Sequence, residues 1–124
     1  MRSAILLIAL AGTLAVAAPA AAAPRISVSP NPVDHDQAQT VKGRGWPVIE
    51  FCKRTVRISL RSAQNAVTLG TAHVRRSGRF RFTWTADDEN VGAGRWRLVA
   101  RMKCESGEDG SPNPVRRSVR VRVL

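Results

Sequence analysis

The clearest stretch of the sequence is residues 95–104, which read RWRLVARMKC. One parity of this stretch is apolar or a cysteine: Trp96, Leu98, Ala100, Met102 and Cys104. The other parity carries Arg95, Arg97, Val99, Arg101 and Lys103. Successive side chains of a β-strand point to opposite faces of a sheet, so this period of two predicts a strand with one face in the core and one cationic face in water.

Similar short runs continue from Arg25 onward, separated by clusters of Gly, Pro, Asn and Asp. The predicted strands lie near residues 26–28, 38–45, 55–61, 66–74, 79–85, 95–104 and 119–123. No run has the period of an amphipathic helix. Seven short strands without crossover helices predict an all-β fold, and they favour a seven-stranded antiparallel β-sandwich over a small barrel, the second architecture that the pattern allows.

Length and charge limit the answer further. The chain has 124 residues, 44% of them hydrophobic, which is typical of one globular domain and not of a disordered chain. Twenty Lys and Arg against nine Asp and Glu leave a formal net charge of +11. Most of these basic residues are Arg, whose planar guanidinium binds phosphate and carboxylate with two hydrogen bonds better than the ammonium of Lys does. A compositional bias of the source genome would produce the same excess of Arg.

The N-terminus has the three parts of a secretory signal peptide. It begins with the positive start Met1-Arg2, continues with the apolar or small run Ala4–Ala18, and ends in small residues at Ala20–Ala23. No cysteine directly follows the apolar run, at the position that a lipid anchor would need, which argues against a lipid-anchored form.

We therefore expect a signal peptide over residues 1–23, cleaved near Ala22 or Ala23, and a single secreted, extracellular domain over residues 24–124. The alternative is an uncleaved anchor, because residues 3–23 are almost long enough to span a bilayer. We predict no transmembrane segment in the mature chain.

Cys52 and Cys104 are the two cysteines of the sequence. In a secreted chain they predict a disulfide, and both fall on the inward parity of their strands. Closing a loop of about 50 residues stabilises a domain by about 4 kcal/mol in the chain-entropy model. We expect the bond to join the two layers of the sandwich. A catalytic or metal-binding thiol is not favoured, because neither Cys has a CxxC partner or a nearby His.

Several motifs follow one another along the mature chain: ISVSPNPV, QTVKGRGWP, TVRISL, LGTAHVRRSGRFRFTW and VGAGRWRLVARMKC, followed by a valine-rich strand. In this series of motifs the chain resembles the small secreted immunoglobulin-like domains of actinobacteria. The resemblance implies an immunoglobulin-like β-sandwich with Cys52 bonded to Cys104, and its motifs concern fold more than function. A distant likeness to the neocarzinostatin-type apoproteins rests on VKGRGW and implies a small-ligand carrier, but those proteins usually have a second disulfide and an acidic surface.

In an immunoglobulin-like sandwich the third, sixth and last of these strands share a sheet. Their outward side chains then form one candidate anion-binding face of Arg57, Arg97, Arg101, Lys103, Arg120 and Arg122. Phosphate-rich envelope polymers, anionic lipids and nucleic acid all fit such a face, because a polyanion relieves repulsion among like charges. The alternative is a solvated surface whose arginines discourage edge-to-edge pairing. No aromatic residue is interleaved, so we expect no sequence-specific recognition of nucleic acid.

Acidic residues are concentrated in three predicted loops. Asp34-His35-Asp36 and residues 87–90, which read DDEN, lie at the same end of the predicted sandwich. Their oxygens suit calcium, but turn geometry and charge balance explain the same composition, and we predict no metal and no cofactor. Residues 105–114 form a long acidic loop at the opposite end, which we expect to be mobile, with a recognition tip as the alternative.

The sequence gives little support to catalysis. His35 and His73 are the two histidines, and no Ser or Cys is placed as a nucleophile beside either. Asp87 and Asp88 are adjacent and tend to point apart, so they do not form a pair of catalytic carboxylates. We predict that the protein is not an enzyme.

The tryptophans complete the sequence-based prediction. Trp46, Trp84 and Trp96 are expected in the core and in turns, with Trp46 partly exposed before Pro47.

The expected function is a secreted, non-enzymatic binding or structural module whose partner is a protein or an anionic polymer of the cell envelope. The alternative is a small-ligand carrier of the neocarzinostatin type.

Overall fold

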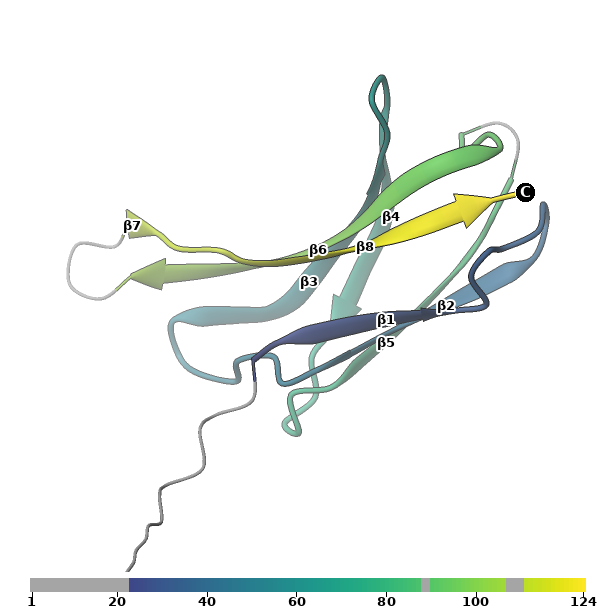
Figure 1. The fold of residues 1–124 in the computed structure, drawn as a ribbon. Helices are drawn as coiled ribbons and strands as arrows, with labels where there is room; N and C mark the ends of the chain where they lie inside the picture. Colours follow the sequence, from purple (N-terminus) through teal and green to yellow (C-terminus); the bar gives the residue numbers. More distant parts are fainter. Residues whose placement is uncertain (1–22, 88–89, 107–110) are drawn as a thin grey trace, which may run out of the picture.

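A computed structural model of the chain shows two β-sheets packed face to face (Figure 1). The structure describes residues 23–87, 90–106 and 111–124, so the predicted signal peptide lies outside the described residues except for Ala23. Within the described residues there are strands and no helix. The strands are β1 (Arg25–Ser29), β2 (Ala38–Arg44), β3 (Cys52–Arg61), β4 (Ala66–His73), β5 (Phe80–Thr85), β6 (Gly94–Ser106), β7 (Ser111–Pro112) and β8 (Val115–Val123).

The two sheets divide the strands three and four. One sheet has the order β1–β2–β5, and the other places β4, β3, β6 and β8 side by side, with all neighbours antiparallel. The all-β, two-sheet prediction is confirmed, and so is the expectation that the third, sixth and last predicted strands share a sheet. Two features were not predicted: the two-residue β7, which pairs with the end of β6, and the start of β8 at Val115.

The core lies between the two sheets and follows the predicted parity. The inward residues of β3 and β6 are buried, and Ile58, Leu60, Leu98 and Met102 are each 0% exposed. Burying an aliphatic side chain of this size contributes about 1.5–3 kcal/mol. The packing of these inner faces is therefore the largest favourable contribution to the fold.

The sequence VKGRGW is explained by close packing against β5. The ring of Phe80 lies directly over Gly43, in the space that a side chain would need. A Cβ built at this position would come within 2.0 Å of that ring, so only glycine fits. Gly45 has a φ of 73°, which glycine adopts without strain. The chain then turns Trp46 edge-on against Phe80, with ring centroids 5.5 Å apart, and its indole N–H donates to the carbonyl of Arg25.

The expectation that Trp46 is partly exposed is wrong. Its exposed fraction is 2%, because Phe80 covers the ring and Arg25 accepts its only polar hydrogen. The prediction that the tryptophans belong to the core is confirmed for Trp84 and Trp96 as well. Trp84 donates to the buried amide oxygen of Gln39, at 2.9 Å, so the one buried polar side chain among the described residues has a partner.

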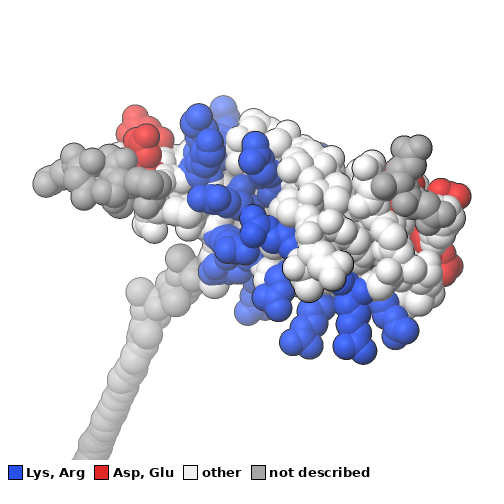
Figure 2. Space-filling view, turned by 90° about the horizontal axis from the view of Figure 1, so that it is seen from above, with Lys and Arg blue, Asp and Glu red and all other residues white. Residues whose placement is uncertain are grey.

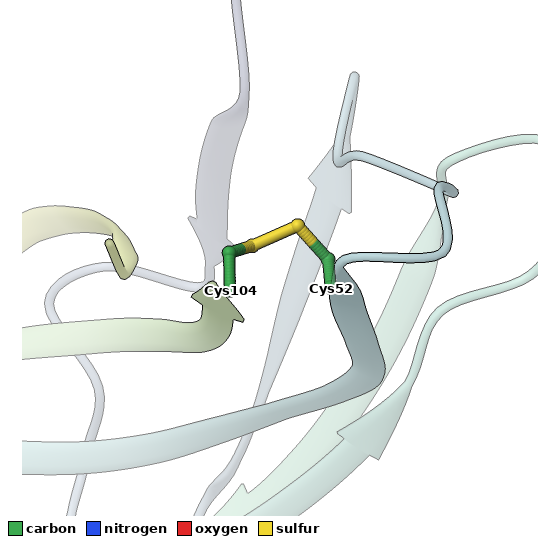
Figure 3. Close-up of a disulfide and its surroundings, with 2 residues drawn as sticks. All are labelled: Cys52 and Cys104. Atoms are coloured by element: carbon green, nitrogen blue, oxygen red, sulfur yellow. A yellow bond between two sulfur atoms is a disulfide. The ribbon is translucent and has the colours of Figure 1, made fainter. Parts of the chain in front are cut away.

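The disulfide between Cys52 and Cys104 is confirmed, but its expected place is wrong (Figure 3). It does not join the two layers. Cys52 stands directly opposite Cys104 on the neighbouring strands β3 and β6 of one sheet, with their Cα atoms 4.0 Å apart. Inward parity puts both cysteines on the core side, but it does not say that they belong to different sheets. The bond reinforces one end of the β3–β6 ladder.

We predict that Gly43→Ala lowers the free energy of unfolding by about 1–3 kcal/mol, the usual cost of overpacking. The added methyl group must displace the buried ring of Phe80. Denaturant titration measures the change. Gly92→Ala is the matched control, because a Cβ at Gly92 meets nothing within 4 Å. Equal midpoints for the two variants would contradict this account of the motif.

We also predict that the double substitution Cys52→Ala, Cys104→Ala lowers the free energy of unfolding by about 4 kcal/mol while the native far-ultraviolet circular dichroism stays that of a β-protein. The loop of 52 residues is released, but the rest of the β3–β6 and β6–β8 ladders remains. An unchanged denaturation midpoint, or a loss of the β-spectrum in buffer, would show that the bond has a different role.

Candidate anion-binding face

The outward surface of the four-stranded sheet brings together all six residues of the predicted face. Because side chains alternate along a strand, these residues lie on the face of the sheet that points away from the core, and each is exposed. Four further basic residues lie on the same surface. We call this surface the cationic face, and its members are Lys53, Arg57, Arg61, Arg95, Arg97, Arg101, Lys103, Arg116, Arg120 and Arg122.

The four additional residues differ in how far the sequence could have revealed them. Arg61 and Arg95 share the outward parity of their predicted strands, so the alternation alone places them on this surface. Arg116 lies in the first part of β8, which begins at Val115, before the alternation of valines that predicted this strand. Lys53 lies where the β3–β6 register shifts, and no local pattern announces that irregularity.

Strand pairing sorts the arginines into rows across the sheet. Arg57, Arg101 and Arg116 stand directly opposite one another on β3, β6 and β8, and we call them the first arginine row. Four residues further along the strands is the second arginine row, which consists of Arg61, Arg97 and Arg120. Beyond it, the pair Arg95 and Arg122 face each other on β6 and β8.

A row of uncharged side chains lies between the two arginine rows. It consists of Ser118 on β8, Val99 on β6 and Ser59 on β3, and it continues to Thr68 on β4. We call it the neutral row. At about 3.3 Å per residue, the two arginine rows are about 13 Å apart along the strands, with the neutral row midway. Neighbouring arginines within a row are about 4.8 Å apart at the backbone.

Within residues 23–87, 90–106 and 111–124, acidic side chains do not pair with this arrangement. No carboxylate among the described residues forms an ion pair with the cationic face. The carboxylate of Asp36 instead lies 3.3 Å from Nε2 of His35. Figure 2 shows Lys and Arg gathered over the middle of the molecule and Asp and Glu at its two ends. Like charges directly opposite each other on a sheet are destabilising, so the rows are under mutual repulsion.

The first and fifth connections meet at one end of the sandwich, as expected. The N–H of Asp36 donates to the carbonyl of Ala86, at 2.7 Å. The carboxylate of Asp87 accepts the N–H of Asn90, at 3.3 Å, which supports the interpretation of this residue as a turn former. Asp88 and Glu89 lie outside the described residues. In the part that is described, no three His, Cys, Asp or Glu side chains are placed to hold a metal ion.

The acidic loop at the other end is partly structured. Glu105 pairs with Pro112, and Ser106 pairs with Ser111, so β6 and β7 extend into what the sequence indicated to be loop. Residues 107–110 lie outside the described residues. The prediction of a loop over residues 105–114 is therefore wrong for residues 105–106 and 111–112, because strand pairing continues past Cys104.

The histidines lie at opposite ends of the sandwich. His35 is exposed in the connection between β1 and β2, and His73 is exposed at the end of β4, opposite Thr55. This separation rules out their acting as a pair. The absence of an enzymatic activity stays a prediction.

Comparison of the chain with known protein families, with curated proteins and with solved structures finds no match in any of the three. Across the residues that the structure describes, no helix has the length and apolar character needed to cross a membrane.

Proposed function

We propose that the chain is a secreted, non-enzymatic binding module whose cationic face holds an anionic polymer of the cell envelope. The observation that carries this proposal is the pairing of arginine with arginine across β3, β6 and β8 in two successive rows. A guanidinium matches phosphate with two parallel hydrogen bonds, so a polyanion both relieves the repulsion and satisfies the donors.

The disulfide supports the extracellular setting, because such bonds persist in oxidising compartments. The strand order supports the immunoglobulin-like assignment: β3, β6 and β8 share a sheet as the corresponding strands of an immunoglobulin domain do. The disulfide departs from that pattern, since in antibody domains it joins the two sheets. The assignment therefore rests on topology and not on the cysteines.

The two other functions considered from the sequence have weaker support. A small-ligand carrier needs space between the sheets, but this space is filled by apolar side chains such as Leu60, Trp84 and Met102. A protein interface is usually anchored by a few large side chains, often aromatic, in its buried centre. The exposed large apolar residues among those described are Ile49, Phe51 and Leu124, and none belongs to the cationic face.

We predict that replacing the first arginine row by glutamine (Arg57→Gln, Arg101→Gln, Arg116→Gln) weakens binding to poly(glycerol phosphate) at low salt by at least about tenfold, because phosphate contacts are lost. The matched control removes three charges from the outward face of the other sheet: Lys42→Gln, Arg44→Gln and Arg81→Gln. Fluorescence anisotropy with a labelled polymer measures both. Equal losses in the two variants would mean that net charge, and not the cationic face, attracts the polymer.

The same first-row variant should be more stable than the unchanged chain at low salt. Two arginine–arginine pairs are removed, and cross-strand charge pairs are worth roughly 0.2–1 kcal/mol each. At about 1 M salt the Debye length falls to about 3 Å, so the difference in unfolding free energy should largely disappear. Denaturant titrations at both salt concentrations test this, and a difference that persists at high salt would point to packing instead of charge.

A further inference from the structure

Building on the proposed function, we propose that the ligand is a single extended phosphodiester chain, which lies along the neutral row between the two arginine rows and crosses the strands of the sheet. The polymer then contacts both rows at once. Bases are not needed for this recognition, and the chemistry is that of repeated phosphates on a narrow, flexible chain.

Three of the four residues of the neutral row form the floor of a trough. This concave surface on the outer side of the sheet is lined by Ser59, Val99 and Thr68 together with the first arginine row and Arg61 of the second. Arg97 and Arg120, the other members of the second row, line an adjacent hollow that shares Arg61. Val99 points outward but is only 3% exposed, so the longer side chains around it rise above it and cover it. A polymer that lies on this floor therefore displaces the flexible side chains that cover Val99, and these side chains then contact it from the two walls.

The dimensions of the trough suit one chain. The walls stand about 13 Å apart at the backbone, and arginine side chains from both sides can reach a chain lying between them. From β8 to β4 the floor crosses four strands, about 14 Å, which is a short length of polymer. The hydroxyls of Ser118, Ser59 and Thr68 add donors for phosphate oxygens along the floor.

A membrane surface or a nucleic-acid base fits this trough less well. A flat, anionic bilayer contacts the ends of the arginine side chains and does not reach the small residues that lie between the two rows. The residues that line the trough include no Trp or Phe, so bases have no stacking platform and a bilayer has no aromatic anchor. A thin polyanion that enters the trough is the ligand that uses both walls and floor.

The decisive experiment fills the trough without changing its charge. Ser118 is exposed on β8 at one end of the neutral row, so Ser118→Phe should fold and place a ring in the channel. We expect its affinity for a synthetic oligo(glycerol phosphate) to fall at least tenfold, while its binding to vesicles of phosphatidylglycerol and phosphatidylcholine is unchanged. Ser27→Phe is the control, because Ser27 is exposed on β1 of the other sheet.

The outcomes separate this inference from the proposed function. If Ser118→Phe binds the oligomer as tightly as the unchanged chain, while the first-row glutamine variant loses binding, the cationic face is the site but the trough is not. If the first-row variant also binds normally, the proposed function itself is wrong. Thr68→Phe, exposed at the other end of the row, gives the same test if Ser118→Phe does not fold.

Salt dependence tests whether both walls participate. For a single strand, log K falls with log salt by about 0.7 per phosphate neutralised, so the loss of either arginine row should reduce the slope by about two. The second-row variant is Arg61→Gln, Arg97→Gln, Arg120→Gln. A reduction confined to this second variant would place the polymer beside Arg95 and Arg122, outside the trough, and overturn the inference.

Discussion

The pairing of β6 with β3 on one side and β8 on the other is the constraint on which the larger sheet depends. This register places Leu98 beside Leu60 on the core side. Because side chains alternate along a strand, the same register sets Arg97 opposite Arg61 and Arg120 on the outer side. The arginine rows therefore follow from the pairing that builds the core, and they do not need a separate structural cause.

The relative sizes of the two effects explain why the sheet tolerates this repulsion. Burying one side chain such as Leu98 or Ile58 contributes about 1.5–3 kcal/mol, whereas a cross-strand charge pair at the surface changes stability by roughly 0.2–1 kcal/mol. Core packing therefore decides the register, and the smaller repulsion between the arginines on the outer surface does not change it. A slip by one residue would expose every inward side chain of β6, so repulsion between arginines cannot shift the strands.

Some features of the candidate site were predictable because they depend on local alternation. The period of two in residues 95–104 separates Met102 from Arg101 on opposite faces, and the structure agrees. Other features depend on contacts between distant segments. The neutral row exists because Ser118 pairs with Val99 and Val99 with Ser59, and the burial of Trp46 depends on Phe80. Neither the pairing of these three strands nor the contact between Trp46 and Phe80 can be predicted from the pattern within one short run of residues.

By itself, the sequence determined that the chain forms short strands, which side of each strand faces the core, and that Cys52 bonds to Cys104, because these follow from side-chain alternation and from having two cysteines. Only the tertiary structure decided that the disulfide lies within one sheet, and that the arginines form two rows with a row of uncharged residues between them. Strand neighbours and register are set by core packing and strand pairing between segments far apart in the chain, which local patterns do not encode.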